Sequence, residues 1–114
     1  MAVQLPIEIQ KWLEQSIPDR AIEKAAVKVV LAKIAEAAPG KSVELRIPPH
    51  AAIQIVEGTN HRRGTPGAVV EMSATALIHL AIGDESWSDL VAEGKLLASG
   101  ERSDLSHLFP IWNL

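Results

Sequence analysis

Two histidines near the second expected strand are the first candidates for chemistry in this sequence. His50 directly follows Pro48 and Pro49, and His61 begins a loop run that contains two arginines. Imidazoles can bind a metal ion or transfer protons when further ligands or an acid stand within reach. Because no Asp, Glu or Cys accompanies the pair at a spacing typical of metal ligands, we expect no metal and no cofactor. Hydrogen bonding to loop backbone is the favoured role, and an enzyme that uses His50 and His61 is kept as an alternative.

The arginine pair Arg62 and Arg63 is the most suggestive polar motif. Two guanidinium groups beside a glycine and a hydroxyl can hold a carboxylate or phosphate through forked hydrogen bonds. Such a site could receive the head group of a fatty acid or an acyl-CoA-like molecule. The residues of this candidate head-group site are His50, His61, Arg62, Arg63 and Thr65. The alternative is a structural ion pair from either arginine to Glu57 or Glu71.

The other histidines and the serines have structural explanations. His79 lies between Ile78 and Leu80 on an apolar helix face, where a half-buried histidine with a local partner is expected, and His107 is expected at the surface. Three serines stand where helix N-caps belong, and none occupies the Gly-x-Ser-x-Gly turn that exposes a nucleophile. These serines are Ser73, Ser86 and Ser103. The sequence therefore predicts caps and no catalytic nucleophile.

The elements that position these residues follow from hydrophobic periodicity and from turn residues. A short helix begins at Pro6, and a longer one spans Asp19 to Ala38, where a wide apolar surface could pack on a sheet or on a partner subunit. Alternation of apolar and polar residues, or short apolar runs, predicts strands at 43–47, 51–56, 68–72 and 95–99. Run 68–72 is apolar on both faces except for Glu71, as in a strand covered on two sides. The capping serines predict helices that begin after 73, 86 and 103.

Composition limits the class of protein. The chain has 114 residues, 47% of them hydrophobic, which is enough for one domain over residues 1–114 with residues 1–17 as a helical extension. The formal net charge of -3 argues against nucleic acid as a partner. Cysteine is absent, no apolar run is long enough for stable membrane insertion, and the start does not read as a secretion signal. We therefore expect a cytoplasmic α+β domain with a mainly antiparallel four- to five-stranded sheet covered by helices.

One long segment and two short ones carry a resemblance to a known family. The run from Val69 to Phe109 resembles the sterol carrier protein type two fold, with its Glu93-Gly94-Lys95 turn and its strand that ends in Ser99-Gly100. Segments 46–54 and 61–66 are similar to a small bacterial branch, actinobacterial in type, related to the C-terminal domain of mycothiol-dependent maleylpyruvate isomerases. No segment resembles the four-helix metal-binding region of those isomerases, so their activity is not implied.

The resemblance implies non-enzymatic binding or transport of a small apolar ligand, such as a lipid, a fatty acid or an acyl-CoA-like molecule. Its site would be a cavity between sheet and helices. Large apolar side chains that could line it, or could equally form an ordinary core, are Leu77, Ile78, Trp87, Leu90, Leu96, Leu105, Leu108, Phe109 and Trp112. The alternative function is an interaction or accessory module with a closed pocket, which forms a homodimer or binds a partner protein through the Asp19 to Ala38 helix. The apolar tail 110–114 should dock on the cavity mouth, the domain's own core or another subunit.

Overall fold

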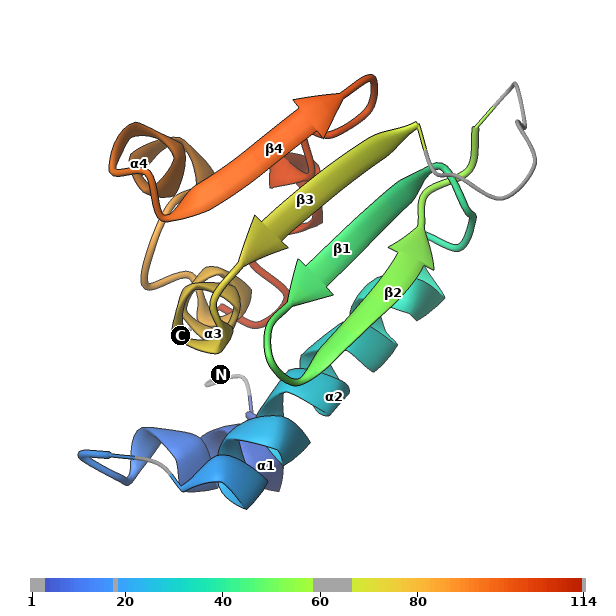
Figure 1. Ribbon diagram of the computed structural model, residues 1–114. Helices are drawn as coiled ribbons and strands as arrows, with labels where there is room; N and C mark the ends of the chain where they lie inside the picture. Colours follow the sequence, from blue (N-terminus) through green and yellow to red (C-terminus); the bar gives the residue numbers. More distant parts are fainter. Residues whose placement is uncertain (1–3, 18, 59–66, 114) are drawn as a thin grey trace.

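Four short strands form one sheet in the order β2-β1-β3-β4 (Figure 1). The computed structural model describes residues 4–17, 19–58 and 67–113. The strands are β1 Val43–Ile47, β2 Ala51–Ile55, β3 Ala68–Met72 and β4 Leu96–Gly100. β1 and β3 run parallel, whereas the β1–β2 and β3–β4 pairs are antiparallel. The prediction of an α+β fold with a mainly antiparallel sheet is confirmed, and the strands lie within one residue of their expected bounds.

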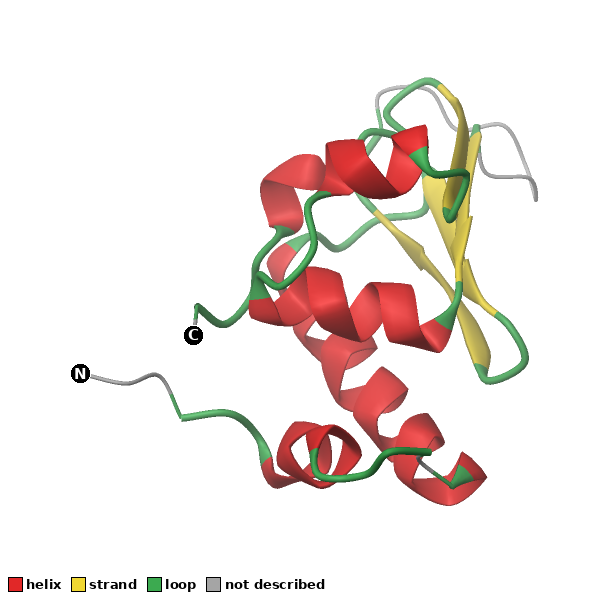
Figure 2. Ribbon diagram, turned by 90° about the vertical axis from the view of Figure 1, so that its left-hand side faces the viewer, coloured by secondary structure: helices red, strands yellow, loops and turns green. Residues whose placement is uncertain are grey.

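The helices gather on one side of this sheet (Figure 2). They are α1 Ile7–Leu13, α2 Arg20–Ala37, α3 Ala74–Ile82, α4 Trp87–Ala92 and the 3₁₀ turn η1 Ser106–Leu108. In the part of the chain that the structure describes, no helix is both long and apolar enough to cross a membrane. None of the described helices covers the opposite face of the sheet.

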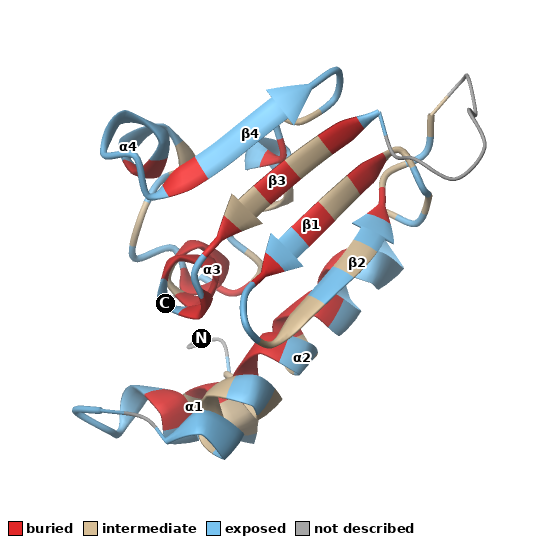
Figure 3. Ribbon diagram, viewed as in Figure 1, coloured by how far each residue is buried: buried red, intermediate tan, exposed pale blue. Residues whose placement is uncertain are grey.

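Strand burial follows from this two-layer arrangement. Val43, Leu45 and Ile47 of β1 are fully buried, whereas Arg46 between them is exposed (Figure 3). β3 was expected to be covered on both faces, and this prediction was wrong. Val69 and Glu71 are only half-buried, because neighbouring strands shield them from the sides but none of the described elements lies over them.

Three helices begin at a residue whose side-chain oxygen accepts a hydrogen bond from a backbone amide of the first turn. Asp19 Oδ1 accepts a hydrogen bond from Ile22 N at 2.8 Å, and Ser73 Oγ accepts one from Ala76 N at 3.1 Å. Ser86 Oγ accepts from Asp89 N at 3.2 Å. Each bond satisfies a backbone donor that the helix itself leaves unpaired. The predicted N-caps at Ser73 and Ser86 are confirmed, and the structure adds Asp19 as the N-cap of α2.

A small helix follows Ser103 as predicted, but it is a single 3₁₀ turn, and the prediction that Ser103 caps it was wrong. The segment makes only the short turn η1, and the side chain that bonds to its start belongs to Asp104, whose Oδ1 accepts from Ser106 N at 2.9 Å. A local bond of this kind offers the backbone an alternative to a helix. Pro110 also limits the room for further turns, because the residue before a proline avoids helical geometry. Phe109 accordingly has extended backbone, with φ -119° and ψ 149°.

Candidate ligand-binding groove

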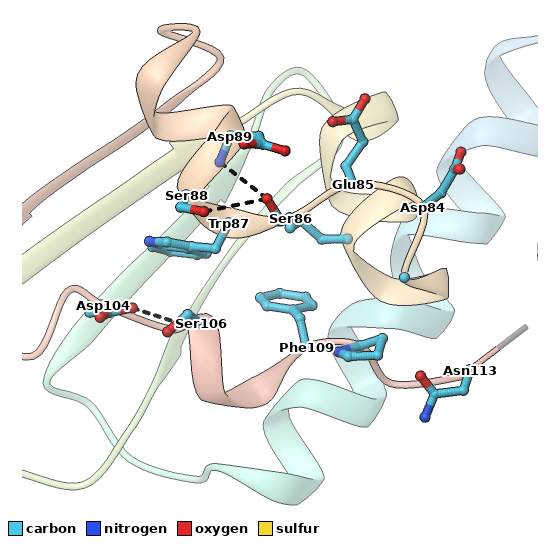
Figure 4. A pocket seen from close by; sticks show the side chains of 13 residues that line it. Asp84, Glu85, Ser86, Trp87, Ser88, Asp89, Asp104, Ser106, Phe109 and Asn113 are labelled. Carbon is cyan, nitrogen blue, oxygen red and sulfur yellow. Dashed lines mark hydrogen bonds between the residues drawn. The ribbon is translucent and has the colours of Figure 1, made fainter.

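A groove of about 870 Å³ lies between the α3–α4 connection and the C-terminal segment (Figure 4). We call it the aromatic groove, because a tryptophan and a phenylalanine are its large ring side chains. Its lining residues are Leu80, Gly83, Asp84, Glu85, Ser86, Trp87, Ser88, Asp89, Asp104, Ser106, Phe109, Pro110 and Asn113. Two stretches that are distant in sequence, 80–89 and 104–113, therefore form this site together.

Local rules place Trp87 at one wall of the groove. Gly83 ends α3 with a left-handed φ of 80°, a conformation that side-chain-bearing residues adopt at a cost. The chain then turns and starts α4 at the Ser86 cap, so Trp87 is the first residue of that helix. Turn and cap together hold the indole against the C-terminal segment.

Phe109 forms the opposing ring. The centroids of the Trp87 and Phe109 rings are 6.3 Å apart and their planes differ by 23°, which is a stacked pair. This separation lies within the range of direct aromatic contact, so nothing inserts between the rings. Both residues are half-buried, and their exposed parts give the groove an apolar surface.

The polar part of the groove is acidic. Four carboxylates line it, from Asp84, Glu85, Asp89 and Asp104, and no Lys or Arg occurs among the lining residues. Figure 4 shows Asp84 and Glu85 extending from the α3–α4 connection away from the Phe109 ring, while Asp104 and Ser106 lie on the facing segment. Carboxylates at this spacing create a negative potential that favours neutral or cationic groups over anions.

Two of these carboxylates have partners within the chain. Asp84 Oδ2 lies 2.5 Å from His79 Nδ1, which gives the half-buried His79 the local partner that the sequence predicts. The backbone amide of Ser106, its hydroxyl and the nearby His107 hold the pKa of Asp104 below its usual value of 3.8, the amide having the largest effect. The lowered pKa favours the ionised form of Asp104, which contributes negative charge to this wall of the groove.

A smaller groove of about 360 Å³ lies between the end of α2 and the C-terminal segment. Its lining residues are Lys33, Ile34, Glu36, Ala37, Leu108 and Ile111. Because Lys33 and Glu36 bring one charge of each sign, this groove lacks the strong acidity of the aromatic groove.

The nine expected cavity residues fall into two groups. Trp87 and Phe109 line the aromatic groove, and Leu108 lines the smaller one. The others are packed in the core with at most 8% of their surface exposed: Leu77, Ile78, Leu90, Leu96, Leu105 and Trp112. In this structure those six side chains contribute to packing between sheet and helices.

The C-terminal tail docks on its own domain. The backbone amides of Ile111 and Trp112 both donate to Ala81 O, at 2.8 and 2.9 Å. The Trp112 side chain is buried, with 8% of its surface exposed. Of the three places that the sequence left open for this tail, the structure selects the core and the end of α3.

Most residues of the candidate head-group site lie outside the residues that the structure describes. His61, Arg62, Arg63 and Thr65 are outside the described residues, and so is any contact between His61 and His50. Described residues fix the two ends of the sheet. His50 lies at the end of the sheet where Ile47 pairs with Ala51. Val43, at the opposite end of β1, pairs with Ile55 and with Ala68, which are the last residue of β2 and the first residue of β3.

His50 has a partner that sequence reasoning missed. Its Nε2 lies 2.9 Å from Glu23 Oε1, and only 4% of its side chain is exposed. The other Glu23 oxygen, Oε2, accepts from Trp12 Nε1 at 3.4 Å. The ring centroids of Trp12 and His79 are 5.6 Å apart, and the ring planes meet at 76° in a T-shaped contact. No local sequence signal connects these residues. Within residues 4–17, 19–58 and 67–113, no group of three His, Asp or Glu side chains could hold a metal ion.

Comparison with known families agrees with this fold. A family model described as bacterial SCP ortholog, where SCP denotes sterol carrier protein, matches residues 19–111. No curated protein matches the chain significantly. The match spans α2 to the C-terminal segment, including both walls of the aromatic groove, and leaves α1 outside. The chain therefore belongs to the family of bacterial sterol carrier protein orthologs.

Proposed function

We propose that the protein binds a small apolar or amphiphilic molecule without transforming it, and that the aromatic groove receives the apolar part. The observation that carries this proposal is the half-exposed Trp87–Phe109 pair in a groove of about 870 Å³. Ligand sites are typically concave, lined by aromatic side chains and supplied with a few polar groups. Membership in a sterol carrier family supports the same class of ligand.

The proposed site differs from a tunnel between sheet and helices. Leu77 and Ile78 on α3 and Leu96 on β4 are buried by packing, so a ligand there would have to separate close-packed side chains. The aromatic groove needs no such separation. A ligand would cover the outer edges of both rings while its polar end meets the carboxylates or solvent.

The acidic lining favours a neutral or cationic head group. A fatty acid carboxylate near Asp89 and Asp104 would meet like charge. Binding of a fatty acid or an acyl-CoA-like molecule would instead need the cationic pair Arg62 and Arg63, which lies outside the described residues. A set of ligands with equal chain length and different head-group charge therefore distinguishes binding in the aromatic groove from binding at Arg62 and Arg63.

Backbone and indole NMR titration tests this proposal. Decanol, decyltrimethylammonium and decanoate, each below its micelle concentration, are added to the labelled protein. We expect decanol and decyltrimethylammonium to shift the Trp87 indole and the Phe109 amide, with decanoate weaker. Failure of every probe to shift these resonances, or shifts confined to other residues, contradicts the aromatic groove as the site.

A matched pair of variants on α4 controls this experiment. Trp87→Ala removes one ring and should weaken decanol binding by about tenfold, since burial of part of an aromatic side chain contributes on the order of 1.4 kcal/mol. Val91→Ala alters an exposed residue of the same helix that does not line the groove, and should leave the affinity unchanged. Equal losses in both variants would indicate a general effect of disturbing α4.

Packing of the expected cavity residues favours a second candidate, an interaction module with a closed pocket. Six of the nine side chains that could have formed a cavity wall are buried instead. The wide face of α2 has little to offer such a partner, because the large exposed apolar side chains of the described residues lie elsewhere: Ile7, Leu13, Ile17, Val91 and Leu97. Light scattering tests this candidate, and a strict monomer that binds decanol would count against it.

A further inference from the structure

β4 is an open edge of the sheet (Figure 1). Among the described strands it pairs only with β3, so one row of its backbone N–H and C=O groups has no strand partner there. Leu97 is 63% exposed on the face without helices. Ala98 is exposed as well, although it lies on the same, helix-covered face of the sheet as the buried Leu96. The helix layer therefore leaves most of β4 uncovered.

Proteins usually protect such an edge with charges, prolines or a covering element. The other edge, β2, has two of these features, since Pro48 and Pro49 precede it and α2 packs beside it. β4 reads Leu-Leu-Ala-Ser-Gly and carries neither a charge nor a proline. The charged residues stand immediately outside the strand, Lys95 before it and Glu101 after it.

We propose that β4 pairs antiparallel with β4 of a second copy of this chain, about a two-fold axis at Ala98. In a two-fold antiparallel pair, the residue at the axis lies opposite itself and all other positions are reflected through it. Full overlap of the five-residue strand requires the axis at its middle residue, which is Ala98. Leu96 then lies opposite Gly100 of the second copy, and Leu97 opposite Ser99.

Charge complementarity selects this same register. With the axis at Ala98, Lys95 and Glu101 of the second copy, which flank the two strands at the same end, come next to one another, and two-fold symmetry repeats this pair at the other end. An axis at Leu97 would instead set Lys95 against the uncharged Ser99 of the second copy. An axis at Ser99 would set Leu97 against Glu101. Opposite charges at directly facing positions stabilise a strand pair, whereas like charges destabilise it.

The residues at the proposed interface have little else to bind among the described side chains. Lys95 Nζ lies 3.8 Å from Glu93 Oε1, in an exposed contact that contributes little. Ala98, Ser99 and Gly100 are small, so two backbones can approach to strand distance. One pair of short strands buries less area than a standard stable interface, so we expect a weak dimer that forms at high concentration.

Sedimentation equilibrium from about 1 µM to about 1 mM tests the dimer and its register. Lys95→Glu and Glu101→Lys each set like charges opposite one another at both ends, and each should weaken dimerisation by about tenfold. The double variant exchanges the charges and should restore it. Lys28→Glu, on the exposed side of α2, is the matched control and should leave the dimer unchanged. A monomer at all concentrations overturns the proposal, as does a dimer indifferent to both single reversals.

A crosslink tests the axis independently. The chain contains no cysteine, so Ala98→Cys introduces a single thiol that should lie opposite its own copy and form a disulfide dimer under mild oxidation. Thr75→Cys, exposed on α3, is the control and should crosslink far less. Equal crosslinking of the two variants would overturn the assigned axis. Neither experiment depends on ligand binding in the aromatic groove.

Discussion

His50 Nε2 lies 2.9 Å from Glu23 Oε1, across 27 positions of sequence. This contact joins the turn between β1 and β2 to the first turn of α2. Glu23 also accepts from Trp12 Nε1, so the same carboxylate ties α1 to the domain. A residue that the sequence offers as a catalytic or head-group candidate thus has a structural partner in the fold.

Glu23→Ala should destabilise the protein by about 1–3 kcal/mol. The substitution leaves the nearly buried imidazole of His50 without its partner, and an unpaired buried polar group costs on this order. Urea unfolding followed by circular dichroism measures the change. Glu36→Ala, at an exposed position near the end of the same helix, is the control and should stay within about 0.5 kcal/mol of the parent. Equal effects of the two substitutions would contradict a structural role of the His50–Glu23 contact.

Two serine variants test which predicted caps are real. Ser73→Ala should cost about 1 kcal/mol of unfolding free energy, because Ala76 N loses its acceptor. Ser103→Ala should change stability by less than about 0.5 kcal/mol, since the side chain at the start of η1 is that of Asp104. Thermal or urea unfolding of both variants provides the comparison. A loss at position 103 as large as that at position 73 would mean that Ser103 caps after all.

Asp104 should titrate below the usual aspartate value of 3.8. Its ionised form accepts hydrogen bonds from the Ser106 amide and hydroxyl, and these bonds lower its pKa in the folded state. A folded-state pKa below the unfolded one contributes stability above about pH 3.8, and that contribution is lost as pH falls through the folded value. Carboxyl-detected NMR titration measures the midpoint.

Ser106→Ala is the matched variant for this titration. It removes the hydroxyl but keeps the backbone amide, so the pKa of Asp104 should move only part of the way back toward 3.8. A parent midpoint at or above 3.8 would contradict the hydrogen bonding seen at η1. So would a variant midpoint below that of the parent.

The sequence alone determined the features that depend on neighbouring residues. The caps at Ser73 and Ser86 follow from a side-chain oxygen placed before a helix-forming run. Alternation over Val43 to Ile47 determined which face of β1 is buried. Resemblance in the stretch from Val69 to Phe109 led to the family that the comparison then confirmed.

Only the tertiary structure decided which distant residues meet. It paired β1 with β3, placed Glu23 on His50, and brought Phe109 against Trp87. It also buried Leu77 and Leu105 in the core, whereas the sequence left both core packing and cavity lining possible for them. Residue type and spacing show which side chains are apolar and which of them lie on the same face of a helix or strand. Which element covers that face depends on long-range packing of the whole chain, and the aromatic groove and the open edge of β4 both arise where that packing stops.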